Sequence, residues 1–162
     1  MKITNKQKKI FLMTAAIIIV AVILLISFCQ DNVKKLVLTN ADTGEEYGTF
    51  CLPESDEFAV TFVHSVNKSP VTDVYIAKGK DIYLDRTIYY DFGAGVPTTL
   101  QEGQKLEFGD NGEMIISGYD MKIPDLLYIV GTVSDHTLTV GDEETSLRTL
   151  CGRNSKVRFA IS

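Results

Sequence analysis

The chain has 162 residues, 45% of them apolar and 23% charged, which is typical of a folded protein and excludes a disordered one. It has 16 basic and 21 acidic residues, and four of the basic residues precede residue 10. The remainder sets 12 basic residues against 21 acidic ones, a formal charge of −9. This charge excludes nucleic acid as a partner, because the phosphates would be repelled.

The first predicted element is a transmembrane helix over residues 10–28, where IFLMTAAIIIVAVILLISF contains no charge. A helix of this length spans roughly 28 Å, close to the thickness of a bilayer's hydrocarbon core. The lysines within residues 1–9 predict a cytoplasmic N-terminal tail. The sequence thus predicts a single-pass cell-membrane protein with a tether at 29–35 and an extracytoplasmic domain at 36–162.

A cleaved signal peptide and a lipoprotein are the alternatives to this membrane anchor. The apolar region of a signal peptide usually has about 7 to 15 residues and ends in small residues, whereas this run is longer and ends in Phe28. The bulky Phe28 directly before Cys29 also fits lipidation of that cysteine poorly. We therefore favour an anchor that is retained.

The rest of the chain is predicted to form short strands. Apolar and polar residues alternate with a period of two through segments that are separated by glycine-rich turns. The predicted strands are 36–39, 46–52, 57–64, 71–77, 81–92, 105–108, 113–117, 126–133, 136–140, 145–150 and 156–162. Many short strands joined by tight turns indicate antiparallel pairing. The predicted fold is all-β, an antiparallel β-sandwich or barrel-like domain preceded by one N-terminal transmembrane helix.

The segment 81–92 shows the clearest alternation, with one exception. Ile82, Leu84 and Ile88 share an apolar face, and the odd-numbered residues point the other way. Arg86 falls on the apolar face. Either a β-bulge shifts the register at this point, or the arginine reaches a polar partner.

Cys51 and Cys151 are candidates for a disulfide, since disulfides persist outside the cytoplasm. A loop of this length would contribute up to about 4.7 kcal/mol in the chain-entropy description. The alternative is two unrelated buried thiols, because the sequence alone does not place the two Cα atoms within bridging distance. The cysteines and histidines show no zinc-finger spacing.

The stretch HSVNKSPVTD, residues 64–73, is the first candidate site. His64, Ser65, Lys68 and Asp73 combine a base, a hydroxyl, a cation and an acid, a set that could bind an anion or a partner. The alternative is a hairpin whose polar side chains bond only to the backbone of the turn.

One strand register would bring two of these residues together. His64 continues the inward-facing stripe of the strand predicted at 57–64. If His64 lies opposite Asp73, then Phe62 lies opposite Tyr75, which is a favourable aromatic pair. In that register the carboxylate would fix the tautomer of the imidazole and raise its pKa.

The loop FGAGVP, residues 92–97, is the second candidate site. Gly93 and Gly95 on either side of Ala94 allow positive φ and expose successive N–H groups, which can cradle a carboxylate. No helix pattern follows Pro97, and the spacing is not that of a phosphate-binding loop. The alternative interpretation is a bend between two strands.

His136 begins the strand predicted at 136–140. Together with His64 and a carboxylate it could bind a metal, although a lone histidine at a strand end is more often structural. A serine hydrolase built on Ser65 is a further hypothesis, but the sequence has no nucleophile elbow, and Ser65 and His64 should point apart. We therefore expect no catalytic residue, no metal and no cofactor.

The two motifs together resemble a known family. HSVNKSPVTDVY followed some twenty residues later by FGAGVP is similar to the paired signature of the domain of unknown function 1850 family, and the resemblance covers 36–162. The matching positions are His64, Ser65, Val66, Lys68, Pro70, Val71, Gly93, Ala94, Gly95 and Pro97. Three positions depart from the pattern: Asn67 stands where an acid is expected, Ser69 replaces threonine and Asp73 replaces glutamate.

The resemblance implies a short anchor followed by a β-rich outer domain, with no established reaction. It also implies an association with tripartite (TRAP) secondary transporters of the TAXI type, which import small organic acids with an extracytoplasmic binding protein. We therefore expect an accessory or interaction module that contacts permease or binding-protein subunits through the His64 turn and the Gly93–Pro97 loop. The alternative is direct binding of a small carboxylate or metal by the same loops, with Lys68 contacting the anion.

Overall fold

A computed structural model of the chain describes residues 33–66, 68–91, 96–97 and 99–162. The predicted tail at 1–9, the predicted transmembrane helix at 10–28 and Cys29 lie outside these residues. In the part of the chain that the structure describes, no helix is long and apolar enough to cross a membrane. Residues Lys34–Ser162 form one compact unit.

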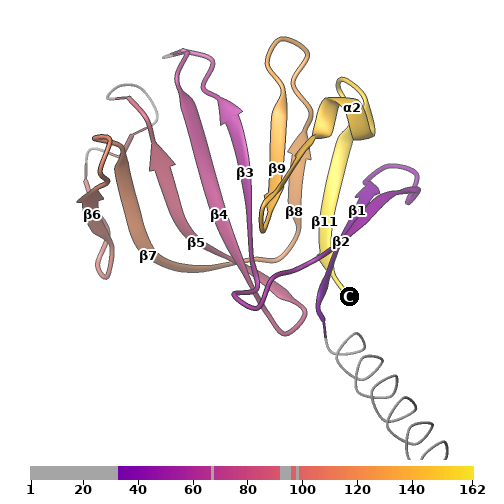
Figure 1. Ribbon diagram of the computed structural model, residues 1–162, viewed down its shortest axis with the longest axis horizontal. Coiled ribbons are helices and arrows are strands. Elements are labelled where there is room, and N and C mark those ends of the chain that lie inside the picture. Colours follow the sequence, from indigo (N-terminus) through magenta and orange to yellow (C-terminus); the bar gives the residue numbers. More distant parts are fainter. Residues whose placement is uncertain (1–32, 67, 92–95, 98) are drawn as a thin grey trace, which may run out of the picture. The chain divides into compact units, whose positions relative to one another are not determined.

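Strands dominate this unit, and the pairings between them are antiparallel (Figure 1). The elements are β1 (Lys35–Asn40), β2 (Glu46–Cys51), β3 (Glu57–Val63), β4 (Pro70–Lys78), β5 (Asp81–Tyr89), β6 (Lys105–Phe108), β7 (Met114–Ile123), β8 (Leu126–Ile129), β9 (His136–Val140), β10 (Glu143–Ser146), α2 (Leu147–Cys151) and β11 (Lys156–Ile161). The predicted all-β fold class is confirmed.

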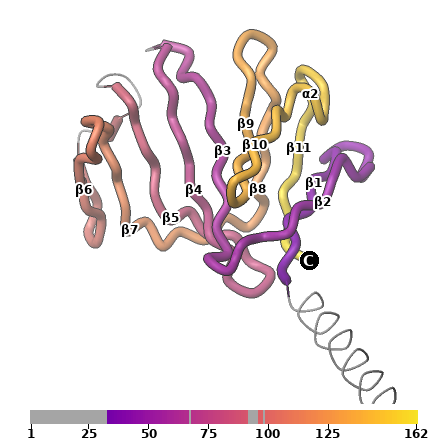
Figure 2. The backbone as a smooth tube through the Cα atoms, viewed as in Figure 1, coloured from indigo at the N-terminus to yellow at the C-terminus, as the bar shows by residue number. Residues whose placement is uncertain are grey.

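The described strands lie in two sheets. The larger sheet has the order β10-β9-β3-β4-β5-β7-β6, and the smaller sheet has the order β2-β1-β11-β8. The chain crosses from the larger to the smaller sheet between β7 and β8, as the tube in Figure 2 shows. The two sheets contribute side chains to one core, and the described strands do not close into a single hydrogen-bonded barrel.

Side chains of both sheets meet in one apolar core. The ring of Phe58 on β3 stacks on Tyr75 of β4, with centroids 5.2 Å apart, and on Phe159 of β11, at 6.1 Å. Phe58 is almost fully buried, so this stack removes a large apolar area from water and joins the two sheets. The other buried members of this core are Leu36, Leu38, Leu52, Val60, Ala77, Ile82, Leu126, Val130, Leu138, Val140, Leu147, Cys151, Val157 and Ile161.

A second apolar cluster lies on the larger sheet. It consists of the buried residues Val71, Tyr89, Met114 and Ile116, with Phe62, Val96 and Tyr119 packed against them. Val96 belongs to the loop after β5, so this loop is attached to the sheet by its apolar side chain.

The bulge that the sequence indicated near Arg86 is present. In the pairing of β4 with β5, Tyr75 lies opposite Leu84 and Val74 lies opposite Arg86, which leaves Asp85 as the extra residue. The strand β7 is irregular at the same level, since its register against β5 also shifts between Leu84 and Arg86.

The bulge changes which residues of β5 point inward. After it, Thr87 and Tyr89 are buried, so the prediction that Ile88 continues the inward face of Ile82 is wrong. Arg86 instead donates to the carboxylate of Glu57, at 2.8 Å. The extra residue in the strand accounts for both changes, because it reverses the alternation.

One predicted strand is partly a helix. Residues 145–150 were expected to be a strand, but β10 ends at Ser146 and α2 begins at Leu147. The Thr149 N–H donates to the Ser146 hydroxyl oxygen at 3.0 Å, so Ser146 is the N-cap of the helix. The pattern TSLRTL does not indicate that a helix begins at Leu147, because serine and threonine occur in strands, in turns and at helix caps.

The candidate pair Cys51 and Cys151 is not joined by a disulfide, and both thiols are free, as in the alternative that the sequence left open. Cys51 is exposed at the end of β2, opposite Lys35, on the solvent face of the smaller sheet. Cys151 is buried in the core at the end of α2. The two side chains therefore lie on opposite sides of a sheet, which no disulfide can span.

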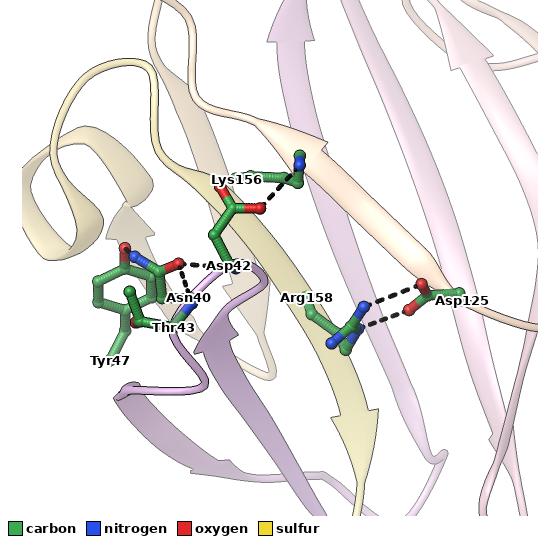
Figure 3. A network of polar contacts seen from close by, with 7 residues as sticks. All are labelled: Asn40, Asp42, Thr43, Tyr47, Asp125, Lys156 and Arg158. Atoms are coloured by element: carbon green, nitrogen blue, oxygen red, sulfur yellow. Dashed lines mark hydrogen bonds and ion pairs between the residues drawn. The ribbon is translucent and has the colours of Figure 1, made fainter.

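Polar contacts on the outer face of the smaller sheet attach two turns to β11 (Figure 3). Lys156 pairs with Asp42 of the β1–β2 turn at 2.8 Å, and Arg158 pairs with Asp125 of the β7–β8 turn, also at 2.8 Å. Asn40 closes the first turn, because its side-chain oxygen accepts the N–H of Asp42 at 2.9 Å. The two ion pairs are exposed and so add little to stability.

The two thiols should differ strongly in reactivity. Burial raises the pKa of the Cys151 thiol to about 11, so both its thiolate fraction and its access to reagent are low. We expect Cys51 in the full chain to react with a soluble thiol reagent at least about a hundredfold faster than Cys151. In a Cys29→Ser background, Cys51→Ser should lose this fast reaction and Cys151→Ser should keep it. If neither thiol reacted before reduction, the free-thiol assignment would be wrong.

Candidate functional site

The turn between β3 and β4 contains the first candidate motif, and its register differs from the one predicted. Val60 lies opposite Asp73, and Phe58 opposite Tyr75. His64 lies beyond the last strand pair, so the predicted pairing of His64 with Asp73 is wrong. The last pair of the two strands is Val63 with Pro70, because the turn begins at His64. The residue opposite Asp73 is therefore Val60, four residues before the predicted His64.

Hydrogen bonds of His64 define the shape of this turn. The His64 N–H donates to the Ser69 carbonyl, and the Lys68 N–H donates to the His64 carbonyl, both at 2.9 Å. The Val66 N–H donates to Nδ1 of the His64 ring at 3.3 Å, which makes the imidazole a local acceptor for the turn. Lys68 has a φ of 58°, the left-handed conformation that closes the turn.

The turn displays its other side chains to solvent. Ser65, Val66 and Lys68 are exposed, and Val66 is 68% exposed despite being apolar. The predicted functional residues Ser65 and Lys68 are thus accessible, whereas His64 is partly buried and supports the backbone.

The strand β5, which leads toward the second candidate motif, ends next to this turn. Tyr89 at the end of β5 lies opposite Val71 at the start of β4, and the Tyr90 N–H donates to the Pro70 carbonyl at 3.4 Å. Gly93, Ala94 and Gly95 lie outside the described residues, so the predicted anion cradle stays a prediction. Pro97 is described and exposed. We call residues 64–66, 68–70, 89–91 and 96–97 the signature end of the larger sheet.

Asp73 is not displayed at this end but joins a partly buried polar network on the inner face. Its Oδ1 accepts the hydroxyl of Thr87 at 2.8 Å, and its Oδ2 accepts the hydroxyl of Tyr128 at 3.1 Å. The Tyr128 hydroxyl also lies 2.7 Å from that of Tyr75. Since Tyr128 donates its proton to Asp73, Tyr75 donates to Tyr128 when Asp73 is ionised.

Burial controls the protonation of this network. It raises the pKa of the Asp73 carboxyl, and the Thr87 and Tyr128 hydroxyls oppose that rise by stabilising the anion. Burial also raises the pKa values of Tyr75 and Tyr128 well above their ordinary value, with the negative charge of Asp73 adding to the effect. The tyrosines therefore stay neutral donors.

His136 packs against the same network. Its ring stacks on Phe62 with centroids 5.7 Å apart and meets the edge of Tyr128 at 5.6 Å. Its Nδ1 accepts the Gly131 N–H at 3.2 Å, and burial lowers its pKa, so the imidazole is held neutral. No group of three or more potential metal ligands occurs among the described residues.

An open pocket of about 180 Å³ lies on the outer face of the larger sheet. Its charged lining residues are Glu57 and Arg86, which pair with each other at 2.8 Å. Because each charge is already compensated, this pocket offers no strong attraction to an anion or a cation.

Comparison with known proteins places the chain in a family. The model of the domain of unknown function DUF1850 matches residues 58–147, more than half of the chain. The chain belongs to the DUF1850 family. No curated protein and no solved structure matches it. The DUF1850 match runs from β3 to the start of α2, so it contains both halves of the signature end and the network of Asp73.

Three residues of this site were missed by the sequence analysis. Tyr75 could have been found, because a period of two places it on the same face as Asp73. Thr87 lies on the same face as Asp73 only because of the bulge at Asp85. Tyr128 is 55 residues from Asp73 in the sequence and lies on the other sheet. No local pattern connects Tyr128 to Asp73.

The raised pKa of Asp73 gives a test by pH. Folded Asp73 holds its proton more tightly than Asp73 in the unfolded chain does. Protonated Asp73 therefore stabilises the folded state fully at pH values below the ordinary carboxyl pKa, and this stabilisation is lost as pH rises through the raised pKa of the folded state. We expect Asp73→Asn to gain stability relative to the wild type as pH rises from about 4, until the folded pKa is passed. Urea unfolding at a series of pH values measures the difference.

A matched variant controls for general effects of removing an acid. Arg158 lowers the pKa of Asp125, so Asp125→Asn should lose relative stability as pH rises through the acid range, opposite in sign to Asp73→Asn. Equal pH dependence for both variants would contradict the assignment of a proton-retaining Asp73.

Proposed function

We propose that this DUF1850 protein is an interaction module that contacts a partner protein through its signature end, as an accessory component of a TAXI-type tripartite organic-acid transporter. The observation that carries the proposal is that β5, the strand that leads toward the second motif, pairs with β4, where the first motif continues, so Tyr89 lies opposite Val71 at one end of the larger sheet. The Tyr90 N–H also donates to the Pro70 carbonyl at this end. The transporter itself is proposed from the resemblance.

The geometry of the turn supports a contact surface. Three hydrogen bonds within residues 64–69 hold the backbone in one conformation, so little conformational entropy is lost when a partner binds. The turn displays Val66, an exposed apolar residue, beside the cation of Lys68. Such a pair suits a partner surface that has an apolar patch next to an acidic group.

The same geometry favours binding over catalysis. The Nδ1 of His64 already accepts the Val66 N–H, and Asp73 already accepts two hydroxyls on the inner face, away from the turn. Ser65 therefore has neither a base nor an orienting acid arranged around it in the described part of the chain. A hydrolase would need all three groups within hydrogen-bonding distance of one another.

The predicted membrane anchor fits this role. A helix at 10–28 would hold the domain at the outer surface, where a permease and its binding protein work. Confinement beside a permease raises the effective concentration of the two partners, so a modest contact surface is sufficient.

A pair of charge reversals at opposite ends of one strand tests the proposal. Lys68 and Lys80 are both exposed, the first two residues before β4 and the second two residues after it. We expect Lys68→Glu in the tagged full-length protein to reduce co-purification of permease or binding-protein subunits at least about fivefold, and Lys80→Glu to leave it unchanged. Quantitative mass spectrometry after cross-linking in the host membrane measures both.

Other outcomes are equally informative. Equal recovery of partners by the wild type and both variants would exclude the signature end as the contact surface. Recovery of the wild-type protein without any transporter subunit would refute the accessory role itself.

A further inference from the structure

The strand β6 lies at the edge of the larger sheet and is unusually open. It pairs with β7 on one side and has no neighbour on the other side among the described strands. The side chains of all its residues, Lys105–Phe108, are exposed. Leu106 is 41% and Phe108 65% exposed, although both are large and apolar. An open edge with exposed apolar side chains is a template for pairing with another strand.

The hydrogen bonds to β7 show which backbone groups face outward. The Gly109 N–H donates to the Glu113 carbonyl at 2.8 Å, directly beyond the pairs Phe108–Met114 and Glu107–Ile115. Residues of an antiparallel strand alternate between bonding to one neighbour and to the other. Glu107 and Lys105 therefore bond toward β7, and Leu106 directs its N–H and carbonyl to the open edge.

We propose that β6 pairs antiparallel with β6 of a second copy of this chain, about a two-fold axis at Leu106. In this register the two Leu106 residues exchange both backbone hydrogen bonds. Lys105 of each copy lies opposite Glu107 of the other, in the pair type that brings side chains closest together. Two opposite-charge pairs form, and each stabilises the pairing.

Charge selects this register over its neighbours. Because backbone hydrogen-bonding groups alternate in direction along β6, two copies can pair only in registers that place residues with edge-directed N–H and carbonyl groups opposite one another. Moving the axis to Glu107 would place two glutamates opposite each other, and moving it to Lys105 would place two lysines opposite each other. Like charges directly opposite destabilise a strand pair, so the sequence KLEF is self-complementary in one register.

The apolar side chains give the second reason for self-pairing. Leu106 and Phe108 lie opposite Ile116 and Met114 of β7, on the face that carries the second apolar cluster. In the paired sheet the two Leu106 side chains would lie opposite each other at the axis, and Phe108 of each copy would lie opposite Gln104 and diagonally next to Leu106 of the other copy. Each copy would contribute the same residues to this contact, as an interface with two-fold symmetry requires.

The other edge strands of the described sheets lack this combination. The edge strand β10 carries Glu143 and Glu144 in succession, so antiparallel self-pairing brings acids together. The edge strand β8, Leu126–Ile129, is uncharged and cannot select a register by charge. The edge strand β2 carries a single charged residue, Glu46.

A charge-swap experiment on the full-length protein tests the pairing. The single variants Lys105→Glu and Glu107→Lys each replace two attractive pairs by two repulsive ones, so we expect each to weaken dimerisation at least about tenfold. The double variant Lys105→Glu with Glu107→Lys restores opposite charges and should dimerise like the wild type. An equimolar mixture of the two single variants should form a heterodimer. Sedimentation velocity measures all four.

Cross-linking gives an independent measurement of the register. Leu106→Cys should form an intermolecular disulfide with itself on mild oxidation, because the two Cα atoms would be about 5.5 Å apart. Val133→Cys, at an exposed apolar position on another loop, is the matched control and should cross-link no more than the wild type. A wild type that stays monomeric, or single reversals that dimerise as well as the wild type, would overturn the proposal. This test does not depend on the transporter partner.

Discussion

The register of β3 against β4 is the constraint on which the candidate site depends. The turn from His64 to Ser69 closes with two backbone hydrogen bonds and so fixes Val60 opposite Asp73. A slip of one residue would move Asp73 to the solvent face and would break the stack of Phe58 between the sheets. One short turn thus determines both which side chains are displayed at the signature end and which acid lies beneath it.

The bulge at Asp85 completes the site from the neighbouring strand. Without the extra residue, Thr87 would face solvent, and Asp73 would have lost one of its two hydroxyl donors. A partly buried carboxylate with one donor fewer would be harder to ionise, because its charge would be less compensated. Arg86, whose position on the apolar face did not fit the alternation in the sequence, directly follows the bulge that turns Thr87 toward Asp73.

Local patterns account for the strands but not for the contacts between them. Segments such as 57–64 and 136–140 were recognisable because a period of two is a local signal. The register was not, since Tyr75 finds an aromatic partner in either Phe58 or Phe62, and only the length of the turn decides between them. The network of Asp73 with Tyr128 depends on the packing of two sheets, which no single segment encodes. The free thiols have a similar cause, because Cys51 lies on the outer face of β2 and Cys151 at the buried end of α2, which the sequence pattern did not predict as a helix.

The signature residues themselves divide into two groups by what they contact. His64 accepts a turn N–H, Pro70 begins β4 and Val71 packs in the second apolar cluster, so their identities are explained by folding alone. Ser65, Val66 and Lys68 have exposed side chains with no such role among the described contacts, although the backbone of Val66 and Lys68 helps to close the turn. A substitution of His64 would therefore change the turn and the displayed surface together. Function has to be probed at the displayed residues, where loss of binding is not confounded by loss of shape.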